Sequence, residues 1–321
     1  MKLSAVMALY NTPYEYLQKT VESILNQSFQ DFELIIVDDC STIEYEEFLS
    51  QFNDSRIKYH KLEKNSGPSN ARNYGIKIAN GEYIAICDSD DVYEKDRFKL
   101  QVEYLDSHEN IGVLGGAYKF SNKLNKVIKP KTKSEDLKIE LLFNSPFANP
   151  IVMLKKQILA DNNFYFPENL KFAEDYYLWI KLLFAKCEMA NLDDVLMVYT
   201  RRSGQLSKQN TEKQKQSLMF VFKTIFENLN MNFTDEDIEN YYKIAINDFK
   251  NINKSSIEEL FNKIIEANNV KNIFDNQKLK EKFNSILIQH KKVNSRLFKL
   301  KIGSKNLCIY KPFKIKLENR D

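Results

Sequence analysis

Residues 81–91 read GEYIAICDSDD, and this segment decides the fold of the chain. Its centre, Tyr83–Cys87, is an apolar run with the length of a buried strand, and three carboxylates follow it within four residues. A second apolar run, Phe32–Val37, also ends in acid, at Asp38-Asp39. Because ligands bind at the carboxyl ends of the strands in parallel sheets, we expect the two acidic clusters to share one functional edge.

Helix-length segments separate these apolar runs from two others, Ser4–Leu9 and Arg56–His60. The first of these segments begins near Thr12, which we expect to act as the N-cap of a helix. The alternation predicts an α/β fold, in which helices flank a mostly parallel, Rossmann-like sheet. Beyond Ser207 the apolar residues recur at helical spacing, so we expect a domain over 1–207 and an α-helical region over 208–321.

The composition is that of a soluble globular protein: of 321 residues, 43% are hydrophobic and 28% are charged. This excludes a fibrous or wholly disordered chain. The four cysteines form no Cys-x-x-Cys pair, which indicates reduced thiols of the cytoplasm and neither disulfides nor a zinc site. No apolar run approaches the roughly 20 residues that span a bilayer.

Positive charge is concentrated near the C-terminus. The chain has a net charge of +3, but residues 278–321 contain 11 Lys and 2 Arg against 3 acidic residues. This basic tail indicates either peripheral attachment to an anionic surface, such as the inner face of the cytoplasmic membrane, or an ordinary solvated face. The small overall charge gives no indication of a nucleic-acid partner, and the oligomeric state is not encoded in any pattern.

The three carboxylates of Asp88, Asp90 and Asp91 repel one another unless water or a cation offsets their charge. Oxygen ligands of this kind suit a hard ion, Mn²⁺ or Mg²⁺, which takes one or two carboxylates together with substrate phosphates. The alternative is a polar turn that caps a helix over Val92–Lys99. The residue types leave both interpretations open.

Three other positions are candidates for chemistry. Arg72 could hold a phosphate with two parallel hydrogen bonds or form a surface salt bridge. Asp175, at the start of a predicted helix over 173–185, is either a helix cap or a general base shielded from water. Arg202 follows a strand that ends near Tyr199, and could clamp a diphosphate or be ordinary surface charge.

Several of these segments occur together in a known family. The chain resembles glycosyltransferase family 2 over about its first 207 residues, through the segments 4–11, 27–41, 67–73, 81–91, 174–175 and 199–207. The resemblance implies a GT-A fold, with a nucleotide-binding part over about 1–110 and an acceptor part over about 111–207. It implies an inverting, metal-dependent transfer of one sugar from a nucleotide sugar, usually a UDP-sugar, to a hydroxyl of a glycan or a lipid-linked glycan.

The resemblance also implies roles for single residues. Asp175 corresponds to the catalytic base, and Asp91, with Asp90, to the metal site for Mn²⁺ or Mg²⁺. The residues that correspond to nucleotide contacts are Ala8, Tyr10, Asp39, Arg72, Asp88, Asp90 and Arg202, of which Asp39 would bind the base and Asp90 the ribose. Arg202 stands where the family often has a histidine, and it can pair with phosphate but cannot ligate a metal.

Two other functions are compatible with the sequence. A sugar-phosphate nucleotidyltransferase uses a similar sheet, although residues 11–13 lack the glycine-rich, basic loop that such an enzyme needs. A non-catalytic nucleotide-sugar-binding protein would keep the same acidic edge. The Gln-x-x-Arg-Trp pattern of processive polymerases is absent, so we expect one sugar to be added per binding event.

Overall fold

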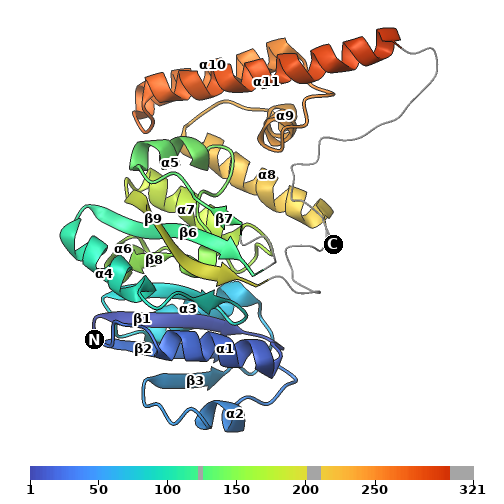
Figure 1. Ribbon diagram of the computed structural model, residues 1–321. Helices are drawn as coiled ribbons and strands as arrows, with labels where there is room; N and C mark the ends of the chain where they lie inside the picture. The colour runs from blue at the N-terminus through green and yellow to red at the C-terminus, as the bar shows by residue number, and fades with distance from the viewer. Residues whose placement is uncertain (122–125, 201–210, 304–321) are drawn as a thin grey trace. The chain divides into compact units, whose positions relative to one another are not determined.

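The computed structural model describes residues 1–121, 126–200 and 211–303 (Figure 1). It divides into two compact units, Met1–Leu141 with Ser145–Ser217, and Leu142–Asn144 with the chain from Leu218 onward. No described helix is long and apolar enough to cross a bilayer.

The strands of the first unit form one mixed sheet. Within the described residues nine strands pair in the order β3-β2-β1-β4-β8-β6-β9-β5, and β7 pairs with β6. Their bounds are β1 (Leu3–Leu9), β2 (Phe32–Asp38), β3 (Ile57–Lys61), β4 (Tyr83–Asp88), β5 (Val92–Tyr93), β6 (Ile111–Phe120), β7 (Val127–Ile128), β8 (Met153–Lys155) and β9 (Glu188–Tyr199). The four strands β3, β2, β1 and β4 are mutually parallel, as the sequence predicts, whereas β8 runs antiparallel to both β4 and β6.

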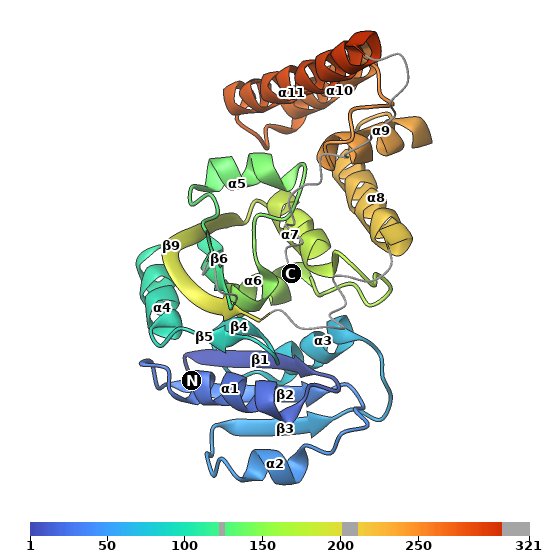
Figure 2. The ribbon, with the colours of Figure 1, turned by 45° about the vertical axis from the view of Figure 1, so that its right-hand side comes forward.

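Helices cover both faces of the parallel strands (Figures 1 and 2). The helices are α1 (Tyr14–Leu25), α2 (Glu46–Ser50), α3 (Pro68–Ile78), α4 (Arg97–Ser107), α5 (Ser134–Leu141), α6 (Lys156–Asn162) and α7 (Glu174–Phe184), with a 3₁₀ turn at Asn149–Ile151. Side chains alternate along β1, so α1 packs on the face that carries Ala5 and Met7. On the other face Gly75 of α3 lies so close to Val6 that a Cβ would sit 2.5 Å from its Cγ1.

The strand register brings the two acidic clusters to one edge. In the parallel pairs of β1, Leu9 lies opposite Asp38 and Ala8 lies opposite Asp88. The carboxyl ends of β2, β1 and β4 are therefore level, which confirms the edge that the sequence predicts. The fold is the mixed α/β fold that the sequence predicts.

One local prediction is wrong, and a helix that belonged to an open alternative is absent from the described residues. Helix α1 begins at Tyr14 with Pro13 in the N-cap position, and no side chain caps it. Thr12 is buried, and its Oγ1 lies 2.6 Å from Oγ of Ser89. The segment after the acidic cluster is not a helix from Val92: β5 pairs with β9 there, Tyr93 is buried in the core, and α4 begins at Arg97.

The described part of the second unit is helical, as predicted. From Leu218 it comprises the rest of α8 (Thr211–Asn228), then α9 (Asp235–Ala245), α10 (Lys254–Lys271) and α11 (Asn276–Gly303). A reciprocal capping box between Thr234 and Asp237 starts α9. The end of the basic tail, from residue 304, lies outside the described residues.

Candidate active site

The turn at residues 88–91, called the acid turn below, joins β4 to β5. Its backbone is held at Asp88: the Tyr93 hydroxyl accepts a hydrogen bond from the Asp88 N–H at 2.8 Å and donates one to the Asp88 carbonyl at 3.2 Å. The Thr20 hydroxyl also donates to the carbonyl of Ser89 at 3.2 Å. The turn is thus held through its backbone, which leaves its carboxylates for other partners.

Asp91 is the most buried carboxylate of the acid turn, with 1% of its surface exposed. Its Oδ1 accepts a hydrogen bond from the backbone N–H of Thr200 at 2.8 Å, while its Oδ2 is buried without a hydrogen-bond partner. Burial, and then the charge of Asp88, raise the pKa of Asp91 well above its ordinary value. A buried carboxylate oxygen with no donor is an arrangement that a bound cation would satisfy.

The residues present fit a hard divalent cation only if the substrate supplies further ligands. Asp90, half-buried, follows the same strand, and oxygen is the donor that Mg²⁺ and Mn²⁺ prefer. Among the described residues, no three His, Cys, Asp or Glu side chains are grouped so as to hold a metal by themselves. Mg²⁺ commonly binds through one or two carboxylates and substrate phosphates, so this donor set is compatible with a metal–diphosphate complex.

Arg72 connects the acid turn to α7. It lies on α3 with 6% of its surface exposed, and its Nη2 is 3.0 Å from Oδ1 of Asp88. Its Nη1 is 3.1 Å from Oε1 of Glu174, the first residue of α7. Although burial acts to lower it, the pKa of Arg72 is raised by the charges of these two carboxylates. Its Nε is buried without a partner.

Asp175 follows Glu174 in the first turn of α7. Its Oδ1 accepts a hydrogen bond from the N–H of Tyr176 at 2.8 Å, and the residue is half-buried. Burial, and then the adjacent charge of Glu174, raise the pKa of Asp175 to about 7, while Arg72 acts in the opposite direction. A carboxyl group with a pKa near neutrality is suited to accept a proton from a hydroxyl.

Asp39 holds the loop that begins α3. Its Oδ1 accepts the backbone N–H of Ser66 at 2.8 Å and its Oδ2 accepts that of Gly67 at 2.7 Å. Gly67 has a φ of 92°, a conformation that side chains rarely adopt. Asp39 therefore positions the helix that carries Arg72. Each carboxylate oxygen has a second lone pair, so this contact leaves capacity for a nucleotide base.

The other sequence-predicted residues have simpler surroundings. Tyr10 follows β1 at the same edge, and half of its surface, 50%, is exposed. Ala8, half-buried, lies in β1 between Val37 and Asp88. Arg202 lies outside the described residues, so its predicted phosphate contact stays a prediction.

The structure therefore brings Arg72, Asp88 and Glu174 into direct contact. Asp175 follows Glu174 in the chain and interacts electrostatically with it, and Asp91 interacts electrostatically with Asp88. No sequence pattern indicates the contact between Tyr93 and the acid turn or the donor at Thr200. Glu174 could have been found, because it directly precedes a predicted base.

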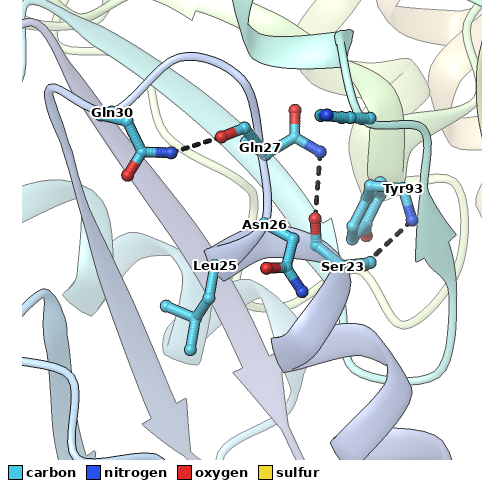
Figure 3. A pocket seen from close by; sticks show the side chains of 7 residues that line it. Ser23, Leu25, Asn26, Gln27, Gln30 and Tyr93 are labelled. Carbon is cyan, nitrogen blue, oxygen red and sulfur yellow. Dashed lines mark hydrogen bonds between the residues drawn. The ribbon is translucent and has the colours of Figure 1, made fainter.

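A cavity of about 620 Å³ lies elsewhere in the first unit (Figure 3). It is formed at the end of α1 and the start of the β5–α4 connection, and its lining residues are Ser23, Leu25, Asn26, Gln27, Gln30, Tyr93 and Lys95. The side-chain amide of Gln27 is already bonded to the carbonyls of Ser23 and Glu94. Of the residues around the acid turn only Tyr93 lines it, so the cavity does not coincide with the acidic edge.

Comparison with known proteins supports the family that the motifs indicate. The model of the glycosyl transferase family 2 matches residues 4–163. An uncharacterised glycosyltransferase of Methanocaldococcus jannaschii is 31% identical over 235 residues, which cover 70% of this chain and 80% of that protein. The poly(ribitol-phosphate) β-N-acetylglucosaminyltransferase TarS of Staphylococcus aureus is 30% identical over 213 residues, which cover 64% of this chain and 36% of TarS.

Solved structures show the same fold. The structure of S. aureus TarS residues 1–349 in complex with UDP-GlcNAc matches with a TM-score of 0.64 and 23% sequence identity, over 95% of this chain and 93% of that one. The complex of the same TarS segment with UDP matches with a TM-score of 0.60. The chain spans most of the archaeal relative but about a third of the length of TarS.

Proposed function

The chain belongs to glycosyltransferase family 2, and we propose that it transfers one sugar per binding event from a UDP-sugar, with inversion. The acceptor in this proposal is a hydroxyl group of a glycan or of a lipid-linked glycan. The observation that carries the proposal is the half-buried Asp175, whose pKa is raised to about 7. Its neighbour Glu174 forms an ion pair with Arg72, and Arg72 forms a second ion pair with Asp88 of the acid turn. One set of contacts thereby couples a proton acceptor to a site for a diphosphate.

The donor half of the proposal rests on the edge formed by β1, β2 and β4. Tyr10 offers an exposed ring for a base, and Asp39 has remaining lone pairs for the base N–H. Two of the TarS structures are complexes with UDP-GlcNAc and with UDP. A UDP-sugar is accordingly the donor class that we propose for this chain, without a choice of sugar.

The chemistry proposed is a single displacement. The acceptor oxygen forms a bond to the anomeric carbon as its proton passes to Asp175, and the bond from that carbon to the diphosphate oxygen breaks, leaving its electron pair on the diphosphate. Asp91 and Asp90 would hold Mn²⁺ or Mg²⁺, which when bound neutralises the charge of the leaving diphosphate. The step requires no covalent intermediate, so no Ser or Cys nucleophile is needed.

We propose in addition that the basic segment 278–321 holds the protein on an anionic membrane surface. Exposed lysines on the described part of this segment, in α11, support the proposal: Lys280, Lys291 and Lys292 face solvent. Glu281 is the one acidic residue between 278 and 295. Flotation with liposomes that contain phosphatidylglycerol, with and without residues 278–321, tests it. Equal flotation of the two proteins would reject it.

The direct test of the transferase proposal is turnover of a panel of UDP-sugars, detected as released UDP in the presence of Mn²⁺. Asp175→Asn should lower kcat by about a hundredfold or more, since it removes the proton acceptor with little change in shape. Asp161→Asn, on the exposed side of α6, is the matched control and should keep parental turnover. Parental turnover in Asp175→Asn would remove the assignment of the base.

A further inference from the structure

Arg97 is a buried cation whose surroundings the transferase chemistry does not explain. It is the first residue of α4, and none of its surface is exposed. Among the described residues no carboxylate lies within ion-pair distance of its guanidinium. Since a buried charge without an ion-pair partner costs several kcal/mol, an apolar side chain would be the more stable choice if the position served packing alone.

The donors of Arg97 are directed at the strand that leads into the acid turn. Its Nη2 donates to the carbonyl of Ile86 at 2.9 Å, and its Nη1 lies 3.5 Å from Sγ of Cys87. Its Nε donates to Oε1 of Gln101 at 3.2 Å. These acceptors are a carbonyl, a thiol and an amide, so the guanidinium orients the end of β4 without forming an ion pair there.

The same guanidinium also contacts Tyr93, which follows the turn in the chain and bonds back to its first residue. Its Cζ lies 4.5 Å from the centroid of the Tyr93 ring, as in a cation–π contact. The hydroxyl of that ring is the group that accepts the N–H of Asp88 and donates to its carbonyl. Arg97 therefore contacts the residues on both sides of the acid turn without touching its carboxylates.

We propose that Arg97 is a positioning residue: through Ile86 and Tyr93 it fixes the backbone of the acid turn in the shape that receives a nucleoside diphosphate and its divalent cation. The proposal rests on the proposed function for the identity of that ligand. Its positive charge also interacts favourably with the buried carboxylate of Asp91, although the two groups form no ion pair. Groups that orient the ligands of a metal commonly change its affinity by 10–100-fold when they are removed.

Two variants and one matched control test this role. Arg97→Met removes the guanidinium and keeps a long side chain, and Tyr93→Phe keeps the ring and removes the hydroxyl. The control, Arg56→Met, removes another arginine that lies 4.5 Å from an aromatic ring, that of Phe32, and that bonds to a backbone carbonyl, but it does not contact the acid turn.

The first measurement is amide hydrogen exchange of the unliganded protein. In Arg97→Met and in Tyr93→Phe the amide of Asp88 should exchange faster, because its acceptor is displaced or lost, while α3 keeps parental exchange. The second is calorimetry with UDP and Mn²⁺, in which Arg97→Met should bind about tenfold more weakly. Arg56→Met should leave both the Asp88 amide and the UDP affinity unchanged.

The outcomes separate the two proposals. Parental exchange at Asp88 in folded Arg97→Met, or in Tyr93→Phe if the first variant does not fold, would overturn the positioning role. Faster exchange at Asp88 with parental UDP affinity would overturn its link to ligand binding. A parent protein that binds no UDP with Mn²⁺ would count against the proposed function, and the exchange experiment would still decide whether Arg97 holds the turn.

Discussion

Arg72 and Glu174 are 102 positions apart in the chain, and their Nη1 and Oε1 atoms lie 3.1 Å apart. With the second contact of Arg72, to Asp88, this pair links the strand edge that carries the acid turn to the helix that carries Asp175. The two halves of the proposed chemistry thus depend on one buried guanidinium. Its removal should affect both stability and turnover.

Arg72→Met should destabilise the fold by about 3 kcal/mol, because it leaves Asp88 and Glu174 without their cation. The cost is at the lower end of the range for buried pairs, since Asp88 retains 32% side-chain exposure. The double variant Arg72→Met/Glu174→Gln should recover part of that loss, as the unpaired charge on Glu174 is gone. Urea unfolding of the single and double variants measures the coupling, and strictly additive effects would show that the pair contributes nothing.

The fold was more accessible from the sequence than the site. β1, β2 and β4 are apolar runs, and acidic residues mark the ends of β2 and β4, so local pattern is enough to place the three strands and the edge that the two acidic clusters share. β5 was missed because a two-residue strand has no periodicity and depends on pairing with β9. The contacts of Arg72 and of Asp39 cannot be predicted from local pattern, because their partners are distant in the sequence. The partners of Asp39 are the backbone N–H groups of Ser66 and Gly67, and a backbone group can be offered by almost any residue type.

The pKa of Asp175 predicts a pH dependence of turnover. Because the carboxyl must be ionised to accept a proton, kcat/KM should rise with pH through about 7 and then level off. Burial is the first cause of that raised pKa and Glu174 is the second, so Glu174→Gln should shift the rising limb to lower pH. A profile that is flat between pH 5 and 8 would contradict the role of Asp175 as base.

The same group predicts how stability depends on pH. The pKa of Asp175 is higher in the folded chain than in the unfolded one, so the folded state holds a proton that the unfolded state releases between about 4 and 7. The contribution of Asp175 to stability is therefore present below its unfolded pKa and is lost as the pH rises to about 7. Over this pH range the melting temperature of Asp175→Asn should therefore fall less than that of the parent, whereas the melting temperature of Asp161→Asn should fall as much as that of the parent.

Alanine substitutions at Gly75 and Gly81 should differ in whether a second substitution restores stability. At Gly75 an added Cβ would meet the side chain of Val6 at 2.5 Å, and at Gly81 it would meet the backbone nitrogen of Ser4 at 2.4 Å. Gly75→Ala should cost about 1–3 kcal/mol and be partly rescued by Val6→Ala, which vacates the space. Gly81→Ala should have no such rescue from Ser4→Ala, because the obstacle is backbone. Equal rescue at both sites in urea unfolding would refute this difference.

Asp91→Asn should stabilise the protein without ligand and weaken its response to metal. Burial raises the pKa of Asp91 well above its ordinary value, so this carboxyl costs the fold stability once the pH exceeds its pKa in the unfolded chain, and an amide removes that cost. The amide oxygen can still accept the N–H of Thr200, while its NH₂ group takes the place of the unpartnered Oδ2. In melting curves at pH 7.5 the variant should melt higher than the parent in EDTA, and UDP with Mn²⁺ should raise its melting temperature less. A variant that melts lower in EDTA and responds fully to UDP with Mn²⁺ would show that Asp91 is held by structure alone and does not contribute to a cation site.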